Sequence, residues 1–181
     1  MGQRGVHAAF MPSKYVFPGG AVDAGDALVE PNFPLDSASA VRLRQNCLAL
    51  APEPNTIAVA ALRELQEETG LRLAYPGQGD AGLRFVFRAI TPPGRSRRFD
   101  ARFLLADAAW VSGDPDDFGA ASDELSHLHW IGLDRARALD LPFITEVVLA
   151  EVSHLLRGGS PDAGVPFFDN SGPIPKFRRL T

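Results

Sequence analysis

Residues 61 to 71 of this 181-residue chain read Ala-Leu-Arg-Glu-Leu-Gln-Glu-Glu-Thr-Gly-Leu. Three of them, Glu64, Glu67 and Glu68, are spaced so that in a helix they fall within an arc of about 100°. Like charges this close repel one another, whereas Mg²⁺ and Mn²⁺ bind carboxylate oxygens well. Most Glu-rich helix faces are only solvated. The carboxylates alone therefore leave two interpretations open, a metal site and a solvated face.

Neighbouring residues favour the metal site. Arg63 precedes Glu67 by four positions, so it can hold that carboxylate in place. Gly70 is typical of a helix end, because glycine readily adopts the left-handed conformation found there. Upstream, residues 17 to 26 read Phe-Pro-Gly-Gly-Ala-Val-Asp-Ala-Gly-Asp. This Gly-rich turn has a backbone that can approach a ligand closely.

Together the two stretches resemble the Nudix box, G-x5-E-x7-R-E-U-x-E-E-x-G-U, in which U is an aliphatic residue. Gly20 matches the first glycine, and Asp26 stands where the box has glutamate. The second half of the box is complete, with matches at Arg63, Glu64, Leu65, Glu67, Glu68, Gly70 and Leu71. Residues 27 to 62 number 36 where the box allows 7, so 29 extra residues split the motif.

The resemblance implies an α/β fold, the Nudix-type α/β/α sandwich with a mixed sheet. The content of 45% hydrophobic and 22% charged residues suits one domain with a proper core. We predict a single Nudix hydrolase domain over residues 1–181, with an insertion at 27–54 and a Pro/Gly-rich tail at 159–181. Only 18 residues precede Gly19, so we expect the chain to lack all or part of the first N-terminal strand.

Hydrophobic periodicity and capping residues predict the main elements. In the insertion, Asp36 or Ser37 caps a helix that extends to Leu50. Asn55 or Thr56 caps the carboxylate helix. Further elements are strands at residues 15–17, 71–73, 83–90, 98–106 and 128–131, a short helix at 133–139, and a last helix at 142–156.

The bulk properties exclude several classes of protein. A net charge of −4 gives no basic field for nucleic acid. No apolar run approaches the ~20 residues of a membrane span, and the first residues lack the apolar centre of a signal peptide. Cys47 is the sole cysteine, which rules out an intrachain disulfide. We expect no nucleic-acid or membrane partner, a cytoplasmic location, and a monomer or, by analogy with the family, a homodimer.

The resemblance also implies the reaction, which is hydrolysis of a diphosphate linked to a second group. Carried over by position, Glu64, Glu67 and Glu68, with the carbonyl of Gly20 or Ala21, would bind Mg²⁺ or Mn²⁺. This metal would neutralise the diphosphate and lower the pKa of the attacking water. Arg63 would orient the metal site. Glu64 is our first choice for activating water, and the loop residue Glu124 is the alternative, although an acidic pair such as Asp123-Glu124 is usually solvated.

Residues 3 to 20, 97 to 103 and 124 to 130 are similar to the acyl-coenzyme A diphosphatase branch of the family. The implied reaction converts coenzyme A or an acyl-coenzyme A to 3′,5′-ADP and a 4′-phosphopantetheine product. The substrate phosphates call for basic side chains, and the candidates are Arg4, Lys14, Arg95, Arg97, Arg98 and Arg102. A solvated arginine loop, another diphosphate substrate (ADP-ribose, a dinucleotide or a nucleoside triphosphate), a non-catalytic binding module and a non-Nudix protein remain alternatives.

Overall fold

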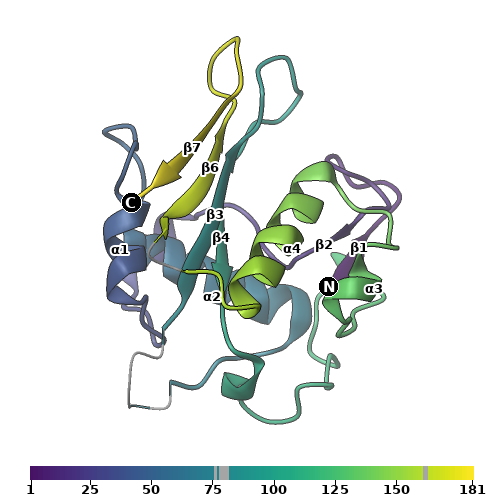
Figure 1. Cartoon of the computed structure of the whole chain (residues 1–181). Coiled ribbons are helices and arrows are strands. Elements are labelled where there is room, and N and C mark those ends of the chain that lie inside the picture. The colour runs from purple at the N-terminus through teal and green to yellow at the C-terminus, as the bar shows by residue number, and fades with distance from the viewer. Residues whose placement is uncertain (76, 78–81, 161–162) are drawn as a thin grey trace.

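A mixed four-stranded sheet forms the centre of the molecule, with strands in the order β4-β3-β6-β7 (Figure 1). The computed structural model describes residues 1–75, 77, 82–160 and 163–181. The sheet strands are β3 (Arg84–Ile90), β4 (Asp100–Leu105), β6 (Val165–Asp169) and β7 (Lys176–Leu180). β3 pairs antiparallel with β4 and parallel with β6, and β6 pairs antiparallel with β7.

A second, smaller sheet has the strand order β2-β1-β5 and lies on the α4 side of the molecule (Figure 1). Its strands are β1 (Gly2–Arg4), β2 (Tyr15–Val16) and β5 (Leu125–Ser126). Two short strands thus precede Gly19, and neither belongs to the four-stranded sheet. The strand predicted at 128–131 is wrong, because pairing occurs at Leu125–Ser126 and the left-handed backbone of His127, with φ 50°, interrupts it.

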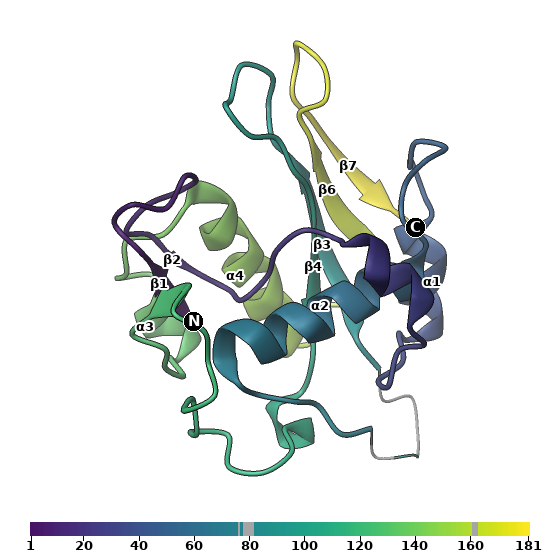
Figure 2. The ribbon, with the colours of Figure 1, turned by 180° about the vertical axis from the view of Figure 1, so that it is seen from behind.

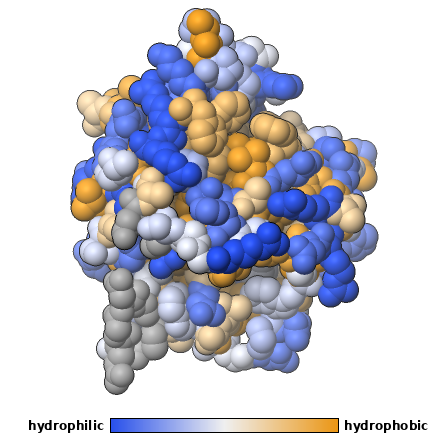
Figure 3. Space-filling view, viewed as in Figure 1, coloured by the Kyte–Doolittle hydropathy of each residue, from blue (hydrophilic) through white to orange (hydrophobic). Residues whose placement is uncertain are grey.

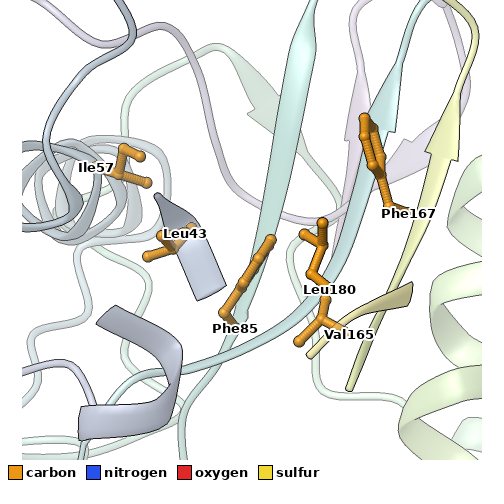
Figure 4. Close-up of a cluster of buried hydrophobic side chains, with 6 residues drawn as sticks. All are labelled: Leu43, Ile57, Phe85, Val165, Phe167 and Leu180. Atoms are coloured by element: carbon orange, nitrogen blue, oxygen red, sulfur yellow. The ribbon is translucent and has the colours of Figure 1, made fainter. Parts of the chain in front are cut away.

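Helices cover both faces of the four-stranded sheet. Leu43 of α1 (Ser37–Leu43) and Ile57 of α2 (Pro54–Thr69) pack on one face, against Phe85 and Phe167 (Figure 4). α4 (Phe143–Leu156) covers the other face, where Val148 and Val152 meet β3. The short elements η1 (Ala24–Leu28), η2 (Ala108–Trp110) and α3 (Leu133–Ala136) complete the chain. This layering is the α/β/α sandwich that the resemblance to the Nudix box implies.

The start and the end of α2 are fixed by local sequence, and they set the positions of the three carboxylates along the helix. Pro54 occupies the first turn after the N-cap Glu53, which is the position where a proline is tolerated best. The predicted caps Asn55 and Thr56 therefore lie inside the helix. At the other end Gly70, with φ 77°, takes the left-handed conformation and donates its N–H to the Gln66 carbonyl oxygen at 2.8 Å.

The insertion begins in the last two residues of η1 and contains α1. Asp36 caps α1 as predicted, since its carboxylate accepts the Ser39 N–H at 2.8 Å. The helix ends at Leu43 rather than Leu50, because the chain turns at Asn46, where φ is 52°. Leu48 and Leu50 are accordingly exposed rather than members of an apolar helix face.

The prediction of a Pro/Gly-rich tail at 159–181 is wrong over most of its length. Residues 165–180 form the β6–β7 hairpin, and Val165, Phe167 and Leu180 are among the buried residues of the core. Pro173 and Pro175 lie in the hairpin turn, outside both strands. The prediction failed because proline and glycine are abundant here and because β6 and β7, of five residues each, have only a few apolar positions.

The surface mixes polar and apolar side chains. On the face shown in Figure 3, apolar surface gathers between the upper part of the sheet and α4. Among the described residues, no helix combines the length and the apolar character that crossing a bilayer requires.

Candidate active site

The two halves of the split motif meet in space on α2. Figure 2 shows the segment that follows β2 running alongside this helix to η1. Gly19, with φ 155°, donates its N–H to Glu68 Oε2 at 2.7 Å. At Gly20 the backbone lies so close to Glu64 that a side-chain Cβ would overlap its carboxylate group. Only glycine therefore fits at position 20 without moving Glu64.

Arg63 joins both halves of the motif through its guanidinium group. Its Nε and Nη2 donate to Asp26 Oδ1 at 2.9 Å and Oδ2 at 3.1 Å, and Nη2 also donates to the Ala21 carbonyl oxygen at 2.9 Å. Its Nη1 donates to Glu64 Oε1 at 2.8 Å and Glu67 Oε2 at 3.0 Å. Arg63 thus fixes two carboxylates relative to the glycine turn.

Asp26, which stands where the box has glutamate, is the main partner of Arg63. Its carboxylate is buried, and the hydrogen bond from Arg63 keeps the pKa of Asp26 below its ordinary value. In the same pair, the hydrogen bond to Asp26 raises the pKa of Arg63. The short helix η1 carries Asp26 and packs against α2, so that the shorter aspartate side chain reaches Arg63.

Burial and like charge set the protonation of the other carboxylates. Glu68 is 2% exposed, and this burial raises its pKa to about 7 despite the Gly19 N–H, with Glu124 and Glu64 adding to the rise. Burial also raises the pKa of Glu64, against the pull of Arg63 and with help from Glu67 and Glu124. These mutually repelling carboxylates favour a proton or a cation among them.

Glu124 reaches this cluster from the loop before β5 and is paired with Arg4. Arg4 Nη2 lies 3.0 Å from Glu124 Oε1, and the Arg4 side chain is 21% exposed. Arg4 Nε is buried and has no hydrogen-bond partner among the described residues. Arg4 is therefore a basic side chain at the site that has one N–H without a hydrogen-bond partner among the described residues.

The donor set fits a hard divalent cation. Within the described ranges, no three His, Cys, Asp or Glu side chains are already arranged as a complete metal site. Mg²⁺ does not require such a cage, because it usually takes one or two carboxylates and completes its shell with waters and substrate phosphates. Glu68 supplies a buried carboxylate and Glu64 one that is 13% exposed, while the more exposed Glu67 is held by Arg63.

The remaining basic candidates lie away from the carboxylates. Lys14 forms an exposed ion pair with Asp140. Arg95, Arg97 and Arg98 belong to the tip of the β3–β4 hairpin, which projects from the end of the sheet away from α2 (Figures 1 and 2).

Arg102 instead bonds to Asp100, which also binds the buried Arg88. The structure thus brings Arg4 to the carboxylates and places the other predicted substrate-binding residues elsewhere.

Sequence reasoning missed the donor role of Gly19. The signal available for it was the Gly-Gly pair, of which only Gly20 belongs to the motif. Asp23 was also missed. Its carboxylate lies 3.8 Å from Arg63 Nη2, and nothing in the sequence distinguishes it from an ordinary loop residue.

Comparisons with known proteins identify the family of the chain. None of the curated proteins matches the chain. A solved structure, the NUDIX hydrolase from Alicyclobacillus acidocaldarius, is similar with a TM-score of 0.47 and 20% identity, over 90% of this chain and 84% of that one. The family model described as NUDIX domain matches residues 51–152, which is more than half of the chain. The chain therefore belongs to the Nudix family of hydrolases, which cleave diphosphate linkages.

Proposed function

We propose that the protein is a Mg²⁺- or Mn²⁺-dependent diphosphatase that converts coenzyme A or an acyl-coenzyme A to 3′,5′-ADP and the corresponding 4′-phosphopantetheine. The observation that carries the reaction is the buried Glu68, whose pKa is about 7, beside Glu64 and Glu124 at the glycine turn. Such an acidic cluster is suited to a cation that carries a diphosphate. The substrate assignment is supported by the sequence similarity of residues 3–20, 97–103 and 124–130 to the acyl-coenzyme A diphosphatase branch.

Each residue has a proposed role. Glu64, Glu67 and Glu68, with the Gly20 carbonyl, would hold the metal, and Arg63 would orient Glu64 and Glu67. A bound Mg²⁺ or Mn²⁺ supplies charge neutralisation at the diphosphate and a lower pKa for water. Arg4, whose Nη2 pairs with Glu124 in this structure, would bring a positive charge to a substrate phosphate.

Two carboxylates are candidates to accept the proton of the attacking water. Glu64 is our first choice, because burial raises its pKa and so improves its match to neutral pH. Glu124 is the alternative, and in this structure its Oε1 is bound to Arg4. The oxygen of the water then bonds to phosphorus as the bridging P–O bond breaks, and the second phosphate leaves with the bridging oxygen.

A panel of diphosphate substrates tests the proposal. The protein is incubated with Mg²⁺ or Mn²⁺ and with coenzyme A, an acyl-coenzyme A, ADP-ribose, a dinucleotide or a nucleoside triphosphate, and the products are identified by mass. We expect 3′,5′-ADP from coenzyme A, none of it with EDTA, and none from the Glu68→Gln variant.

The other outcomes separate the alternatives. Turnover of ADP-ribose without turnover of coenzyme A would keep the reaction and replace the substrate. Metal-dependent binding without any turnover would instead identify a binding module. We further propose a cytoplasmic protein, with a small-molecule partner, that forms a homodimer. Sedimentation measures its oligomeric state.

A further inference from the structure

A groove of about 260 Å³ lies on the flank of α2 and is separate from the carboxylate cluster. The insertion forms one wall, α2 forms the floor and the chain after α2 closes it. Its lining is Val29, Glu30, Pro31, Asn32, Val59, Leu62, Arg63, Gln66, Arg72 and Leu73. Half of these side chains are aliphatic or proline, and none of the described lining residues is an aromatic that could stack on a nucleotide base.

The geometry of α2 gives the distance between the groove and the carboxylates. At about 100° per residue, the groove residues of α2 fall within one arc of about 100°, and the carboxylates fall within another. The centres of the two arcs are about 140° apart around the helix, so the surface path between them is about 15 Å. Arg63 and Glu67 lie between the two faces. Arg63 therefore lines the groove and also holds Glu64 and Glu67.

We propose that this groove binds the acyl chain of an acyl-coenzyme A whose diphosphate lies at the carboxylates, an inference that rests on the proposed function. The 4′-phosphopantetheine arm has about twelve bonds from the phosphate oxygen to the sulfur, equivalent to about four residues of extended chain, or about 14 Å. That length matches the path around α2. The thioester then arrives at the groove, and the acyl chain enters it.

The chemistry of the lining supports an aliphatic occupant. Val59, Leu62 and Leu73 form the apolar floor, and Val29 stands at the rim, where it is 57% exposed. The side chains of Gln66 and Arg72 have no hydrogen bond or ion pair within the described ranges. They are free to bind the thioester carbonyl and the amides of the arm.

Chain-length selectivity tests the inference. We measure kcat/KM for coenzyme A and for its acetyl and hexanoyl thioesters. Each buried methylene is worth about fourfold in binding, so we expect hexanoyl-coenzyme A to exceed coenzyme A by about tenfold or more. The Val29→Asp variant places a charge in the groove and lowers that ratio by about fivefold or more.

The neighbouring Leu28→Asp variant is the matched control, because Leu28 is 88% exposed and does not line the groove. It should keep the wild-type ratio. Equal kcat/KM for all three substrates, or an unchanged ratio in Val29→Asp, would overturn the acyl site and leave the proposed function standing. Absence of any turnover of the three substrates would overturn both. A thermal melt of each variant confirms that it folds.

Discussion

Arg63 is the residue on which the geometry of the site depends most, because its guanidinium binds carboxylates from both halves of the motif. Substituting Arg63→Ala leaves Asp26, which is 3% exposed, as an unpaired buried charge. Loss of one partner from a buried pair destabilises a protein by about 3 kcal/mol. We expect a decrease of that size in the free energy of unfolding, measured by urea titration.

Arg44→Ala is the matched control for this change. Arg44 pairs with Glu53 at 3.3 Å, and both side chains are exposed. Exposed pairs contribute about 1 kcal/mol or less. If both variants lost the same stability, Arg63 would be an ordinary surface arginine.

Gly20 sets the position of Glu64. In Gly20→Ala the new Cβ would displace the Glu64 carboxylate, so turnover should fall by about 100-fold, as expected for a catalytic group moved by about 1 Å. Gly25→Ala is the control in the same loop, since its Cβ would meet nothing within 4 Å. Steady-state kinetics of both variants, on the substrate that the panel experiment selects, measures the difference. Equal activity in the two would contradict a close packing of Gly20 on Glu64.

At the scale of elements, the β6–β7 hairpin is part of the core. Phe167 is 2% exposed and packs beneath the guanidinium of Arg88, whose Cζ is 4.4 Å from the ring centroid. Phe167→Ala should therefore lower the free energy of unfolding by about 3–5 kcal/mol. Ile174→Ala, in the exposed hairpin turn, should change it by about 0.5 kcal/mol or less. Similar losses in both variants would mean that the hairpin does not pack as described.

The elements also show where sequence reasoning succeeds. The spacing of Glu64, Glu67 and Glu68 is a local property of α2, so the helix and its acidic face could be predicted. The pairing of Arg88 with Phe167 across β3 and β6 depends on residues far apart in the chain. No local pattern reports such a contact. For the same reason the sequence suggested Arg95, Arg97 and Arg98 as substrate ligands, although the hairpin that carries them points away from α2.

At the scale of the whole molecule, the raised pKa of Glu68 makes stability depend on pH. Its folded pKa of about 7 exceeds the ordinary value of 4.5, so the folded state binds the extra proton between these values. The metal-free protein should therefore lose stability as the pH rises from about 4.5 to about 7, by roughly 3 kcal/mol. Asp26, whose pKa is lowered, acts in the opposite direction, but only at more acidic pH.

Thermal melts in EDTA check this expectation. Glu68→Gln keeps an acceptor for the Gly19 N–H and removes the charge. Its melting temperature should therefore exceed that of the wild type at pH 8 and equal it at pH 4.5. Addition of about 10 mM Mg²⁺ should then stabilise the wild type alone. A wild type that melts identically with and without Mg²⁺ would argue against Glu68 as a ligand.

The meeting of the glycine turn with α2 also bears on how such a motif can change in evolution. Lengthening a closed loop from 7 to 36 residues raises its closure entropy by about 1.5 kcal/mol, because that entropy grows only with the logarithm of length. This is about the contribution of one charged hydrogen bond, and Arg63 makes several across the join. An insertion at this point is therefore thermodynamically mild, and it adds one wall of the groove on α2 while the contacts between Arg63 and the glycine turn remain in place.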